Sequence, residues 1–586
     1  MIIVGIHNTG TTSSAAIVVD GSLEFGCAEE RLDRRKYSKY FPERAIDACL
    51  DWTGATLADV DAFAIGWNPG INIAGRYRAG FSEWPAYPGA RLYTSANRLL
   101  PRLESGELTA TDQIFAAEPG QGADTRFVHV THHLAHCANA FYLSGFDDAA
   151  LFSCDGYGER TTTVWGRGQG GDITTLRQSA FPHSIGSFYA AVTQFLGFRP
   201  DLDEWKVMGA AAYGDPARYQ AALSGLLNYD EDGRFELDLR YFAHFDFDSR
   251  SLFAPRITEL LGPPRPASAP MEPRHFDIAA ALQAVVETYL FTAVRWLARA
   301  TGCRRACLSG GVMMNSLFNG RLAQTDIFDD VFIPFAPDDS GNSIGAALWL
   351  AHREEPPGRC RVQRSPYLGR DYADDAIRAV LDRFKLRYRV LGDVPGEVAD
   401  LLAAGKVVAW FQGRMEFGQR ALGARSILAD PRDPHMKDRI NAAVKFREGF
   451  RPFAPAVPAE SLGEWFAVDR PLAVPYMEKV LPIRADRRHL IPAVVHADGT
   501  GRLQTVERSM NPLFHDLLTA FGQRTGVPIL LNTSFNVAEE PIVESPADAI
   551  RTFYASGIDA LVCGRYSLIK DGVATGTPES RPDRGP

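Results

Sequence analysis

Cysteine is scarce in this sequence, and its spacing excludes the protein classes that depend on it. Eight cysteines are spread over 586 residues, and only Cys303 and Cys307 lie close together, in a CxxxC spacing without a second pair. Disulfide scaffolds and zinc ribbons need paired cysteines at short spacings. We therefore expect a reduced, cytoplasmic protein.

The sequence also lacks a basic tract and a long apolar run. Its 71 acidic residues outnumber 62 Lys and Arg, for a net charge of -9. Proteins that bind nucleic acid usually present a basic face to the phosphates, so no nucleic-acid partner is expected. No apolar run reaches the roughly 18 residues of a membrane span, and the opening segment MIIVGIHNTG lacks the features of a signal peptide. No membrane association is expected either.

The length and the apolar pattern predict two domains of mixed α/β (α+β) structure. A chain of 586 residues exceeds what one core normally fills. An Asp20-Gly21 pair between two apolar runs is typical of a hairpin, and residues 276–300 have the spacing of an amphipathic helix. A linker-like run follows at 354–358. We expect a first domain at 1–355, a second at 356–575 and a disordered tail at 576–586. No short internal repeat is visible.

Two histidines and two aspartates in the first half predict a metal site. His132 and His136 are four residues apart, which places both imidazoles on one face of a helix. Asp155 and Asp339 each follow an expected strand, where α/β sheets gather ligands. This mixed nitrogen and oxygen set suits Fe(II), Mn(II) or Zn(II). The alternative is two ordinary histidines and two turn-forming aspartates.

A pair of glycines in the first half lies between an expected strand and an expected helix. Gly310 and Gly311 would let the backbone approach a ligand closely, and free N–H groups at a helix start attract phosphate. Asn315 would lie on the first turn. A simple tight turn is the alternative interpretation.

The second half has several basic residues near glycine-containing turns, in a chain that is acidic overall. Arg binds phosphate or carboxylate through two parallel hydrogen bonds, and Lys adds a compact charge. Ser and Asn near a strand end add neutral donors. A solvated basic surface with local salt bridges is the alternative. The candidates for an anion pocket are Arg420, Lys445, Arg447, Arg451, Arg502, Ser534 and Asn536.

Seven segments, in one order along nearly the whole chain, resemble the carbamoyltransferase family of nodulation, cephem and antibiotic-tailoring enzymes. They are EERLDRRKYSKYFP, HHLAH, EWKVMGAAAYG, SGGVMMN, MEFGQRALGARSILADPR, KFREGFRPFAPAV and NTSFNVAEEPIV. The resemblance implies an actin-like ATPase-type N-terminal domain, similar to the tRNA threonylcarbamoyl transferase. It implies a C-terminal domain similar to the synthase of threonylcarbamoyl-adenylate.

The resemblance also implies roles for individual residues. The metal ligands of the family match His132, His136, Asp155 and Asp339, and a phosphate-contacting lysine matches Lys36. The nucleotide loop of the first domain matches Gly310, Gly311 and Asn315. The pocket of the second domain matches Arg420, Lys445, Arg451, Arg502 and Ser534, with Arg447 and Asn536 as weaker matches, and the first three of these are expected to act in catalysis. Glu204 and Lys206 match a segment without an assigned role.

The sequence departs from the family pattern in two places. Where the family often reads His-Asp after the first strand, this chain has Thr11 and Thr12, and Thr is a poor general base. Another group, such as His7 or a metal-bound species, would then have to deprotonate the acceptor. Gln419 and Ala424 stand where the family commonly has Pro and Asn, which changes the surroundings of the neighbouring arginines.

These observations predict an ATP-dependent O-carbamoyltransferase. The second domain would convert carbamoyl phosphate and ATP to carbamoyl-adenylate, and the first would pass the carbamoyl group to a hydroxyl of a small molecule, in secondary metabolism such as antibiotic biosynthesis. The expected cofactors are a divalent metal, with Fe(II) as the first choice, and Mg(II) with ATP. A homodimer is left open. The alternatives are a tRNA-modifying carbamoylation enzyme, a catalytically silent binding protein, and a kinase or hydrolase of the actin-like fold.

Overall fold

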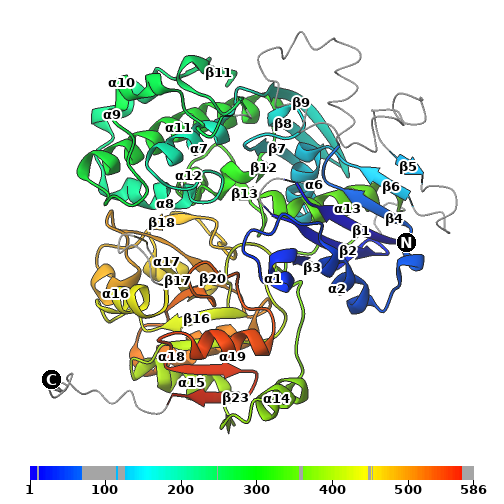
Figure 1. The fold of residues 1–586 in the computed structure, drawn as a ribbon, viewed down its shortest axis with the longest axis vertical. Helices are drawn as coiled ribbons and strands as arrows, with labels where there is room; N and C mark the ends of the chain where they lie inside the picture. Colours follow the sequence, from blue (N-terminus) through cyan, green and yellow to red (C-terminus); the bar gives the residue numbers. More distant parts are fainter. Residues whose placement is uncertain are drawn as a thin grey trace, which may run out of the picture.

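The computed structural model describes residues 1–9, 12–68, 114–116, 126–246, 249–355, 360–445, 451 and 453–570. Figure 1 shows two bodies of mixed α and β structure along the long axis. The first uses the chain up to helix α13 (Asn342–Glu354), and the second uses the chain from helix α14 (Asp374–Arg383) onwards. The predicted boundary at 355/356 falls between these helices. The division into domains stays a prediction, and the predicted tail lies outside the described residues.

The first sheet of the first body is a three-stranded meander extended by parallel strands. Strand β1 pairs antiparallel with β2, β2 with β3, and β4 and then β6 continue the sheet parallel to β1. Asp20 and Gly21 both have positive φ, 49° and 75°, as the predicted hairpin turn requires. The strands are β1 (Ile2–His7), β2 (Ser14–Val19), β3 (Ser22–Ala28), β4 (Ala62–Ile65), β5 (Ile114–Ala116) and β6 (Arg126–His129).

The second sheet repeats this topology. Strands β7, β8 and β9 form the antiparallel meander, and β12 and then β13 extend it parallel to β7. The strands are β7 (Asp148–Cys154), β8 (Thr161–Gln169), β9 (Asp172–Ala180), β12 (Arg305–Ser309) and β13 (Asp330–Phe332). A duplicated five-stranded unit is what the actin-like expectation requires. The predicted mixed α/β class, with an actin-like N-terminal part, is confirmed.

Two helices fill the space between these sheets. Helix α6 (His132–Ser144) packs on β7 and β12 of the second sheet, α13 packs on β1 and β2 of the first, and the two helices pack on each other. The approach is close because glycines stand at the contacts. A Cβ on Gly345 of α13 would lie 1.9 Å from the Ala135 carbonyl oxygen, and a Cβ on Gly5 of β1 would lie 1.8 Å from the Ser343 carbonyl oxygen. The start of α13 is thereby held beside the start of α6.

The longest helix, α11 (Pro273–Thr301), covers the other side of the second sheet. It is capped by Glu272 and ends at Gly302 in the left-handed conformation, where the sequence predicted its end. It is the one helix among the described residues that is long and apolar enough to cross a membrane, and 72% of its most apolar window is buried inside the protein. It therefore belongs to the core of the first body.

Smaller elements complete the first body around α11 and the first sheet. They are α1 (Glu29–Asp33), α2 (Glu43–Thr53), α7 (Ile185–Phe195), α8 (Glu204–Ala210), α9 (Ala217–Ser224), β10 (Leu227–Tyr229), β11 (Phe235–Leu237), α10 (Thr258–Leu261) and α12 (Ser316–Ala323).

The second body is one mixed sheet of eight strands, in the order β14-β23-β22-β15-β16-β21-β17-β20. Helices α15 and α18 bury apolar side chains against one face of this sheet, and α14, α16 and α19 against the other. The strands are β14 (Arg389–Val390), β15 (Val408–Phe411), β16 (Arg425–Ala429), β17 (Ala454–Pro458), β20 (Gln504–Val506), β21 (Leu530–Ser534), β22 (Ala560–Cys563) and β23 (Tyr566–Ile569). The helices are α15 (Val394–Ala403), α16 (Met436–Ile440), α17 (Leu462–Trp465), α18 (Pro512–Thr525) and α19 (Pro546–Tyr554), and a small ribbon pairs β18 (Val480–Pro482) with β19 (Thr500–Arg502).

The sequence around Ser545, Pro546 and Gly557 predicts a helix that is capped by the serine and closed by the glycine. Ser545 caps helix α19 by accepting from Asp548 N, and Pro546 is its first helical residue, as predicted. The helix ends at Tyr554, before Gly557, so the predicted end is wrong. Gly557 instead donates its N–H to the Ala443 carbonyl, and a Cβ there would come within 2.7 Å of the Ala443 side chain. The glycine serves a close chain crossing and not the helix end.

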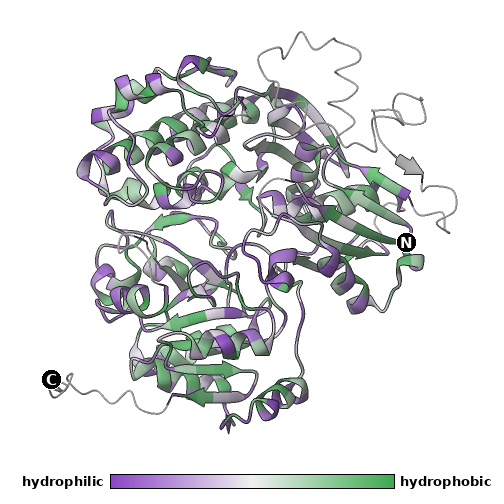
Figure 2. Ribbon diagram, viewed as in Figure 1, coloured by the Kyte–Doolittle hydropathy of each residue, from purple (hydrophilic) through white to green (hydrophobic). Residues whose placement is uncertain are grey.

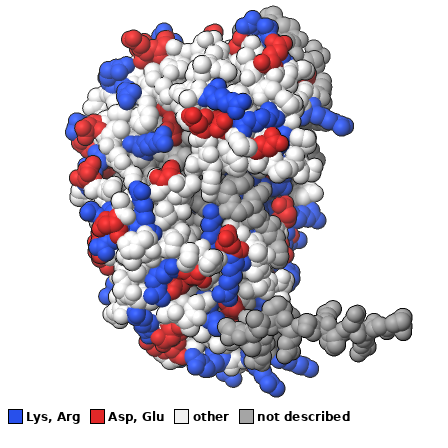
Figure 3. Space-filling model, turned by 90° about the vertical axis from the view of Figure 1, so that its left-hand side faces the viewer, with Lys and Arg blue, Asp and Glu red and all other residues white. Residues whose placement is uncertain are grey.

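Hydropathy follows this architecture. In Figure 2 the strands are mostly green and purple gathers on outward helix faces, as expected when strands form the core. On the face shown in Figure 3, blue and red residues are interspersed over the part of the chain that the structure describes, so positive charge does not gather into one patch there.

Candidate functional site

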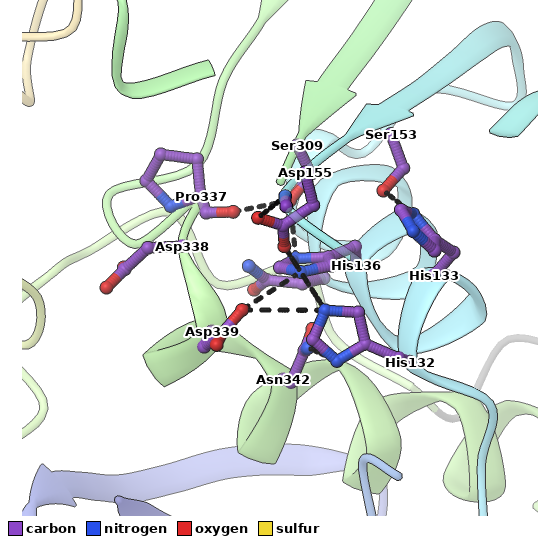
Figure 4. Close-up of polar contacts among 12 residues, drawn as sticks. His132, His133, His136, Ser153, Asp155, Ser309, Pro337, Asp338, Asp339 and Asn342 are labelled. Atoms are coloured by element: carbon purple, nitrogen blue, oxygen red, sulfur yellow. Dashed lines mark hydrogen bonds and ion pairs between the residues drawn. The ribbon is translucent and has the colours of Figure 1, made fainter. Parts of the chain in front are cut away.

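Four side chains of types that can bind a metal meet at the start of α6, beside the loop after β7 and the turn before α13 (Figure 4). His132 and His136 lie one turn apart on α6, Asp155 follows β7, and Asp339 opens a short 3₁₀ turn before α13. The candidate ligand atoms of all four lie within 4.8 Å of one another. The structure thus brings together the four residues that the sequence proposed as metal ligands.

The spacing of these atoms fits a single ion. Ligand atoms held at about 2.1 Å from one metal lie about 3.0–3.5 Å from their neighbours in octahedral or tetrahedral arrangements. The Nε2 atoms of His132 and His136 are 3.1 Å apart. They lie 3.2 and 2.9 Å from Asp155 Oδ2 and 3.5 Å each from Asp339 Oδ1. Two imidazoles and two carboxylates suit Fe(II), Mn(II) or Zn(II).

The charges of the cluster also favour a cation. Burial disfavours ionisation of these groups, but pairing between imidazoles and carboxylates outweighs it. The pairing raises the pKa of His136 to about 9 and holds the pKa of Asp155 well below its usual range. Burial and Asp155 oppose ionisation of Asp339, yet its histidine partners lower its pKa to about 2. Both carboxylates are therefore ionised at neutral pH.

Neighbouring polar groups orient the two histidines. His132 Nδ1 lies 3.2 Å from the Asn342 amide, and His136 Nδ1 lies 3.4 Å from Ser309 Oγ. When Nε2 holds a metal, Nδ1 carries the proton and needs an acceptor. The Asn342 Oδ1 atom is buried without a partner among the described residues, so a turn of this amide would supply that acceptor. The carboxylate of buried Glu159 accepts the His132 backbone N–H at 3.0 Å and so anchors the helix start.

The third histidine of the segment, His133, faces away from the cluster, because adjacent residues of a helix do not share a face. His133 Nδ1 lies 2.7 Å from Ser153 Oγ, and its Nε2 lies 2.9 Å from the Thr161 carbonyl oxygen. Burial lowers the pKa of His133 to about 3. It is a neutral core residue.

The paired glycines are explained by packing around Asp155. Gly310 has φ of 94°, and a Cβ there would lie 2.2 Å from the Cys154 carbonyl oxygen. A Cβ on Gly311 would lie 2.8 Å from Asp155 Oδ1. The turn therefore leaves room for the carboxylate. The predicted role of these glycines in binding nucleotide stays a prediction.

Asn315, which the sequence placed with this turn, forms hydrogen bonds with residues of the first body. Its Oδ1 accepts from Phe318 N at 3.2 Å and so caps α12, and it also accepts from Gln283 Nε2 at 2.9 Å. Its Nδ2 donates to Gln283 Oε1 at 3.2 Å. The next residues, Ser316 and Leu317, line the cavity between the bodies.

That cavity has a volume of about 590 Å³ and joins the two bodies. One end is close to the metal cluster, since Ser340, the neighbour of Asp339, and Thr12 line it. The other end contains most of the predicted anion pocket. The predicted residues that line it are Lys36, Arg420, Lys445, Arg451, Arg502, Ser534 and Asn536.

Lys445 is the most tightly held of these residues. Its Nζ donates to the carbonyl oxygens of Ser534 and Asn536, at 2.5 and 3.0 Å, and to Asn536 Oδ1 at 2.8 Å. Ser534 Oγ in turn donates to Asn536 Oδ1 at 2.7 Å. A buried ammonium held in this way places a fixed positive charge in the wall of the cavity.

The arginines divide into two groups. Burial lowers the pKa of Arg420, and no acidic side chain among the described residues forms an ion pair with it. Arg451 stacks on Trp205, with Cζ 4.0 Å from the ring centroid. Arg425, from the same sequence motif as Arg420, points away from the cavity, because its Nη1 donates to the carbonyl oxygens of Gln412 and Gly413 at 3.0 Å. Arg420 and Arg451 therefore suit an anion, whereas Arg425 is structural.

His7, the candidate base, is fully buried beside the cluster. Its Nε2 lies 2.7 Å from the Thr9 carbonyl oxygen and 3.8 Å from Asp339 Oδ2. Its Nδ1 has no hydrogen-bond partner among the described residues. His7 does not line the cavity, but Thr12 does. Thr11 and Arg447, which the sequence also singled out, lie outside the described residues.

Comparison with known proteins decides the family. The chain matches the Carbamoyltransferase N-terminus family over residues 2–348 and the Carbamoyltransferase C-terminus family over residues 399–570. This chain belongs to the carbamoyltransferase family. It is 37% identical to nodulation protein NolNO of Sinorhizobium fredii, over 98% of this chain and 81% of that protein. It is 30% identical to nodulation protein U of Rhizobium tropici, over 96% of this chain and 95% of that protein.

Solved structures give only distant likenesses to this carbamoyltransferase. An activator of 2-hydroxyisocaproyl-CoA dehydratase from Clostridium difficile has a TM-score of 0.31 and 13% identity, covering 61% of this chain and 96% of that one. Full-length HypF in its phosphate- and nucleotide-bound form has a TM-score of 0.30 and 14% identity, covering 61% and 56%. These superpositions are too weak to inform the function.

Within this carbamoyltransferase, the side chain of Gln419, which stands where the family commonly has Pro, connects the two bodies. Gln419 Nε2 donates to Asp338 Oδ2 at 2.7 Å, and Ser340 Oγ donates to Asp338 Oδ1 at 2.9 Å. Asp338 immediately precedes the candidate ligand Asp339. A proline at 419 would lack this donor, so the substitution ties the anion pocket to the metal loop.

The sequence reasoning missed several charged residues that the first body contributes to the cavity. Their segments, EERLDRRKYSKYFP and EWKVMGAAAYG, were noted, but no pattern within them shows which side chains face a shared cavity. These missed residues include Glu30 and Arg31 of the first segment, and Arg199 and Asp203, which come just before the second segment.

Proposed function

We propose that this carbamoyltransferase uses ATP and carbamoyl phosphate to place a carbamoyl group on a hydroxyl of a small molecule. The observation that carries the proposal is the single cavity that contains the basic residues of the second body and reaches the loop of the metal cluster. One chamber would let a reactive adenylate form at one end and be used at the other without entering bulk water.

The basic residues would bind the two anionic substrates. Carbamoyl phosphate and the ATP phosphates carry several negative charges, and the residues that line the cavity include nine Lys and Arg against five Asp and Glu. Arg420, which lines the cavity and forms no ion pair with the described residues, can pair with a phosphate through two hydrogen bonds. Lys445, fixed by Ser534 and Asn536, supplies a charge that need not reorganise during the reaction. Lys36 would contact phosphate from the first body.

The proposed first step joins the carbamoyl group to AMP. With the uptake of one water, carbamoyl phosphate releases phosphate, and the carbamate oxygen attacks the α-phosphorus of ATP. The bond from that phosphorus to the bridging oxygen breaks, and pyrophosphate leaves with the electron pair. Negative charge builds up on the leaving pyrophosphate, and Arg502, which lines the cavity, would stabilise it. Transfer to the acceptor then releases AMP.

The metal ligands would be His132, His136, Asp155 and Asp339, whose spacing and donor atoms fit one divalent ion. When bound, such an ion supplies Lewis-acid chemistry towards a carbonyl or a phosphate oxygen. The protein positions this chemistry by holding the His132 and His136 rings through Asn342 and Ser309.

His7 is the proposed base for the acceptor hydroxyl. Donation from Nε2 to the Thr9 carbonyl leaves the lone pair on Nδ1, which is the nitrogen that would accept the proton. The acceptor would approach from the side of Thr12, which lines the cavity.

The test measures the first step alone. Full-length protein loaded anaerobically with Fe(II) is incubated with ATP and carbamoyl phosphate, and pyrophosphate, AMP and carbamoyl-adenylate are quantified. Pyrophosphate release should require carbamoyl phosphate and fall about 100-fold or more in Lys445→Ala and in Arg420→Ala. The control Lys385→Ala, at an exposed position away from the cavity, should leave the rate unchanged.

Two outcomes would contradict the proposal. Pyrophosphate release that does not depend on carbamoyl phosphate would point to a different use of ATP. Equal rates in wild type and Arg420→Ala would show that this part of the cavity does not take part in the reaction. Retention of the protein on a tRNA column at physiological salt would turn the search for the acceptor to RNA.

A further inference from the structure

One segment of the first body contacts both loops that form the anion pocket of the second. It comprises residues 199–206, which we name the bridging segment. Arg199 Nη1 donates to Glu539 Oε2 at 3.2 Å, and Trp205 stacks on Arg451 at 4.0 Å from ring centroid to Cζ. Glu539 follows the Ser534–Asn536 turn that holds Lys445. The bridging segment therefore contacts each side of the pocket.

Trp205 is fixed within the bridging segment. Its Nε1 donates to the Leu202 carbonyl oxygen at 3.0 Å, which sets the direction of the ring. Asp203, which is buried, accepts from the Arg199 backbone N–H and pairs with Lys206 at 3.1 Å. The indole is thus a rigid surface that the first body presents to the cavity.

The ring of Trp205 lies against the guanidinium of Arg451, with Cζ 4.0 Å from the ring centroid. A guanidinium that lies flat on an indole keeps the five N–H donors of its edge available in the plane of the stack. Arg451 and Trp205 both line the cavity, together with Arg420, Lys445 and Arg502. Arg451 also follows residues outside the described part of the chain, and Trp205 is the aromatic ring that the structure shows against it.

We propose that Trp205 is a positioning residue, which holds Arg451 in place to bind the phosphate group of the acyl-phosphate substrate. This inference rests on the proposed function. It assigns a role to the EWKVMGAAAYG segment. It also means that the first body helps to build the substrate site of the second, so the two bodies form one catalytic unit.

The chain offers a matched control for this contact. Trp52 of the first body lies against Arg414 of the second, with Cζ 4.3 Å from the ring centroid. Neither of these residues lines the cavity. Trp52→Leu therefore removes a second stack of the same kind between the two bodies, without touching the substrate site.

The experiment uses full-length Trp205→Leu, Trp205→Phe, Arg451→Lys and the double variant Trp205→Leu/Arg451→Lys, with Trp52→Leu as control. In pyrophosphate release, Trp205→Leu should raise KM for carbamoyl phosphate about tenfold, as expected for loss of a half-buried stack, and leave kcat within about twofold. Trp205→Phe keeps an aromatic face and should recover most of the change. In the Arg451→Lys background the Trp205→Leu change should add less than about twofold.

Binding of inorganic phosphate by the same variants, followed by calorimetry, separates this inference from the proposed function. Phosphate affinity reduced about tenfold by Trp205→Leu, in a protein without carbamoyl phosphate-dependent turnover, would leave the positioning role standing and overturn the proposed reaction. Normal wild-type turnover with unchanged KM and phosphate affinity in Trp205→Leu would overturn the positioning role. So would an equal loss in Trp52→Leu or in the Arg451→Lys background. If Trp205→Leu does not fold, Trp205→Phe against Arg451→Lys gives the same comparison.

Discussion

At the scale of single residues, the sequence indicates some members of the candidate metal cluster but not the residues that orient them. The four-residue spacing of His132 and His136 was readable in the sequence, and the helix places both rings on one face. The contact of Asn342 with His132 could not be predicted from the sequence, because no sequence pattern near residue 342 indicates that it lies beside residue 132. The contact depends on two helices that pack from different sheets.

The contact of Asn342 with His132 predicts a measurable change in metal affinity. Asn342→Leu keeps the volume but removes the acceptor for His132 Nδ1, and it should weaken metal binding about 10–100-fold. Asn342→Asp offers only acceptors and should retain affinity. Chelator competition measures both, with His435→Ala as an exposed control. Equal affinities in the Leu and Asp variants would show that the amide does not orient the ring.

A second residue-scale prediction concerns pH. Burial lowers the pKa of His244 to about 4, and its Nε2 lies 2.8 Å from the Pro182 carbonyl oxygen. The unfolded chain, with a pKa near 6.5, binds the proton first, so the stability that this histidine contributes is complete above about pH 6.5 and is lost as pH falls towards 4.

Urea denaturation at pH 7.5 and 5 should therefore show a loss of stability at the lower pH, to which His244 contributes on the order of 2 kcal/mol. His244→Gln should reduce the difference between the two pH values by about that amount. The same substitution at exposed His435 should not change it. An unchanged difference in His244→Gln would mean that His244 is protonated in the folded protein without cost.

At the scale of elements, the site depends on how closely α13 approaches its neighbours. Gly5 and Gly345 allow a strand and two helices to pack with their backbones in contact, which brings the start of α13 beside the start of α6. The sequence did not predict the contact between α6 and α13, since a glycine that permits close packing looks the same as one in a turn.

The packing at Gly345 leads to an element-scale prediction. A Cβ there meets the Ala135 backbone at 1.9 Å, so Gly345→Ala must push α13 away from α6. We expect a loss of about 1–3 kcal/mol in stability together with weaker metal binding, because Asn342 and Asp339 move with α13. Gly463→Ala, where no atom lies within 4 Å of the added Cβ, should be neutral or stabilising. Weakened stability with full metal affinity would contradict the coupling.

At the scale of the whole molecule, arginines of the first body bind backbone carbonyls of the second. Arg34 donates from Nη1 to the Ile542 carbonyl at 2.6 Å and from Nη2 to the Pro541 carbonyl at 3.0 Å, and Arg31 donates to the Gly418 carbonyl at 2.9 Å. These bonds hold the loops that line the cavity. They support a fixed arrangement of the two bodies around one chamber.

Arg34→Lys should loosen this arrangement. Lys retains the charge but cannot reach two carbonyls at once, so we expect a loss of about 1–3 kcal/mol. The unfolding transitions of the two bodies, followed by calorimetry, should move apart. Arg35→Lys changes an exposed neighbour and should leave the transitions unchanged. A single transition with unaltered midpoint in Arg34→Lys would show that other contacts hold the bodies together.

The sequence by itself determined the family, the mixed α/β class, the set of four candidate metal ligands and the basic residues of the second half, because these depend on residue types and local spacing. Tertiary structure decided what depends on pairing between distant strands: the repeated sheet topology, the cavity between the bodies and the partners of each cation. Arg420 and Arg425 share one motif, yet one faces the cavity and the other bonds backbone carbonyls. The direction of a side chain depends on the backbone geometry at that residue and on what packs against it, and the adjacent residues of the sequence do not show either.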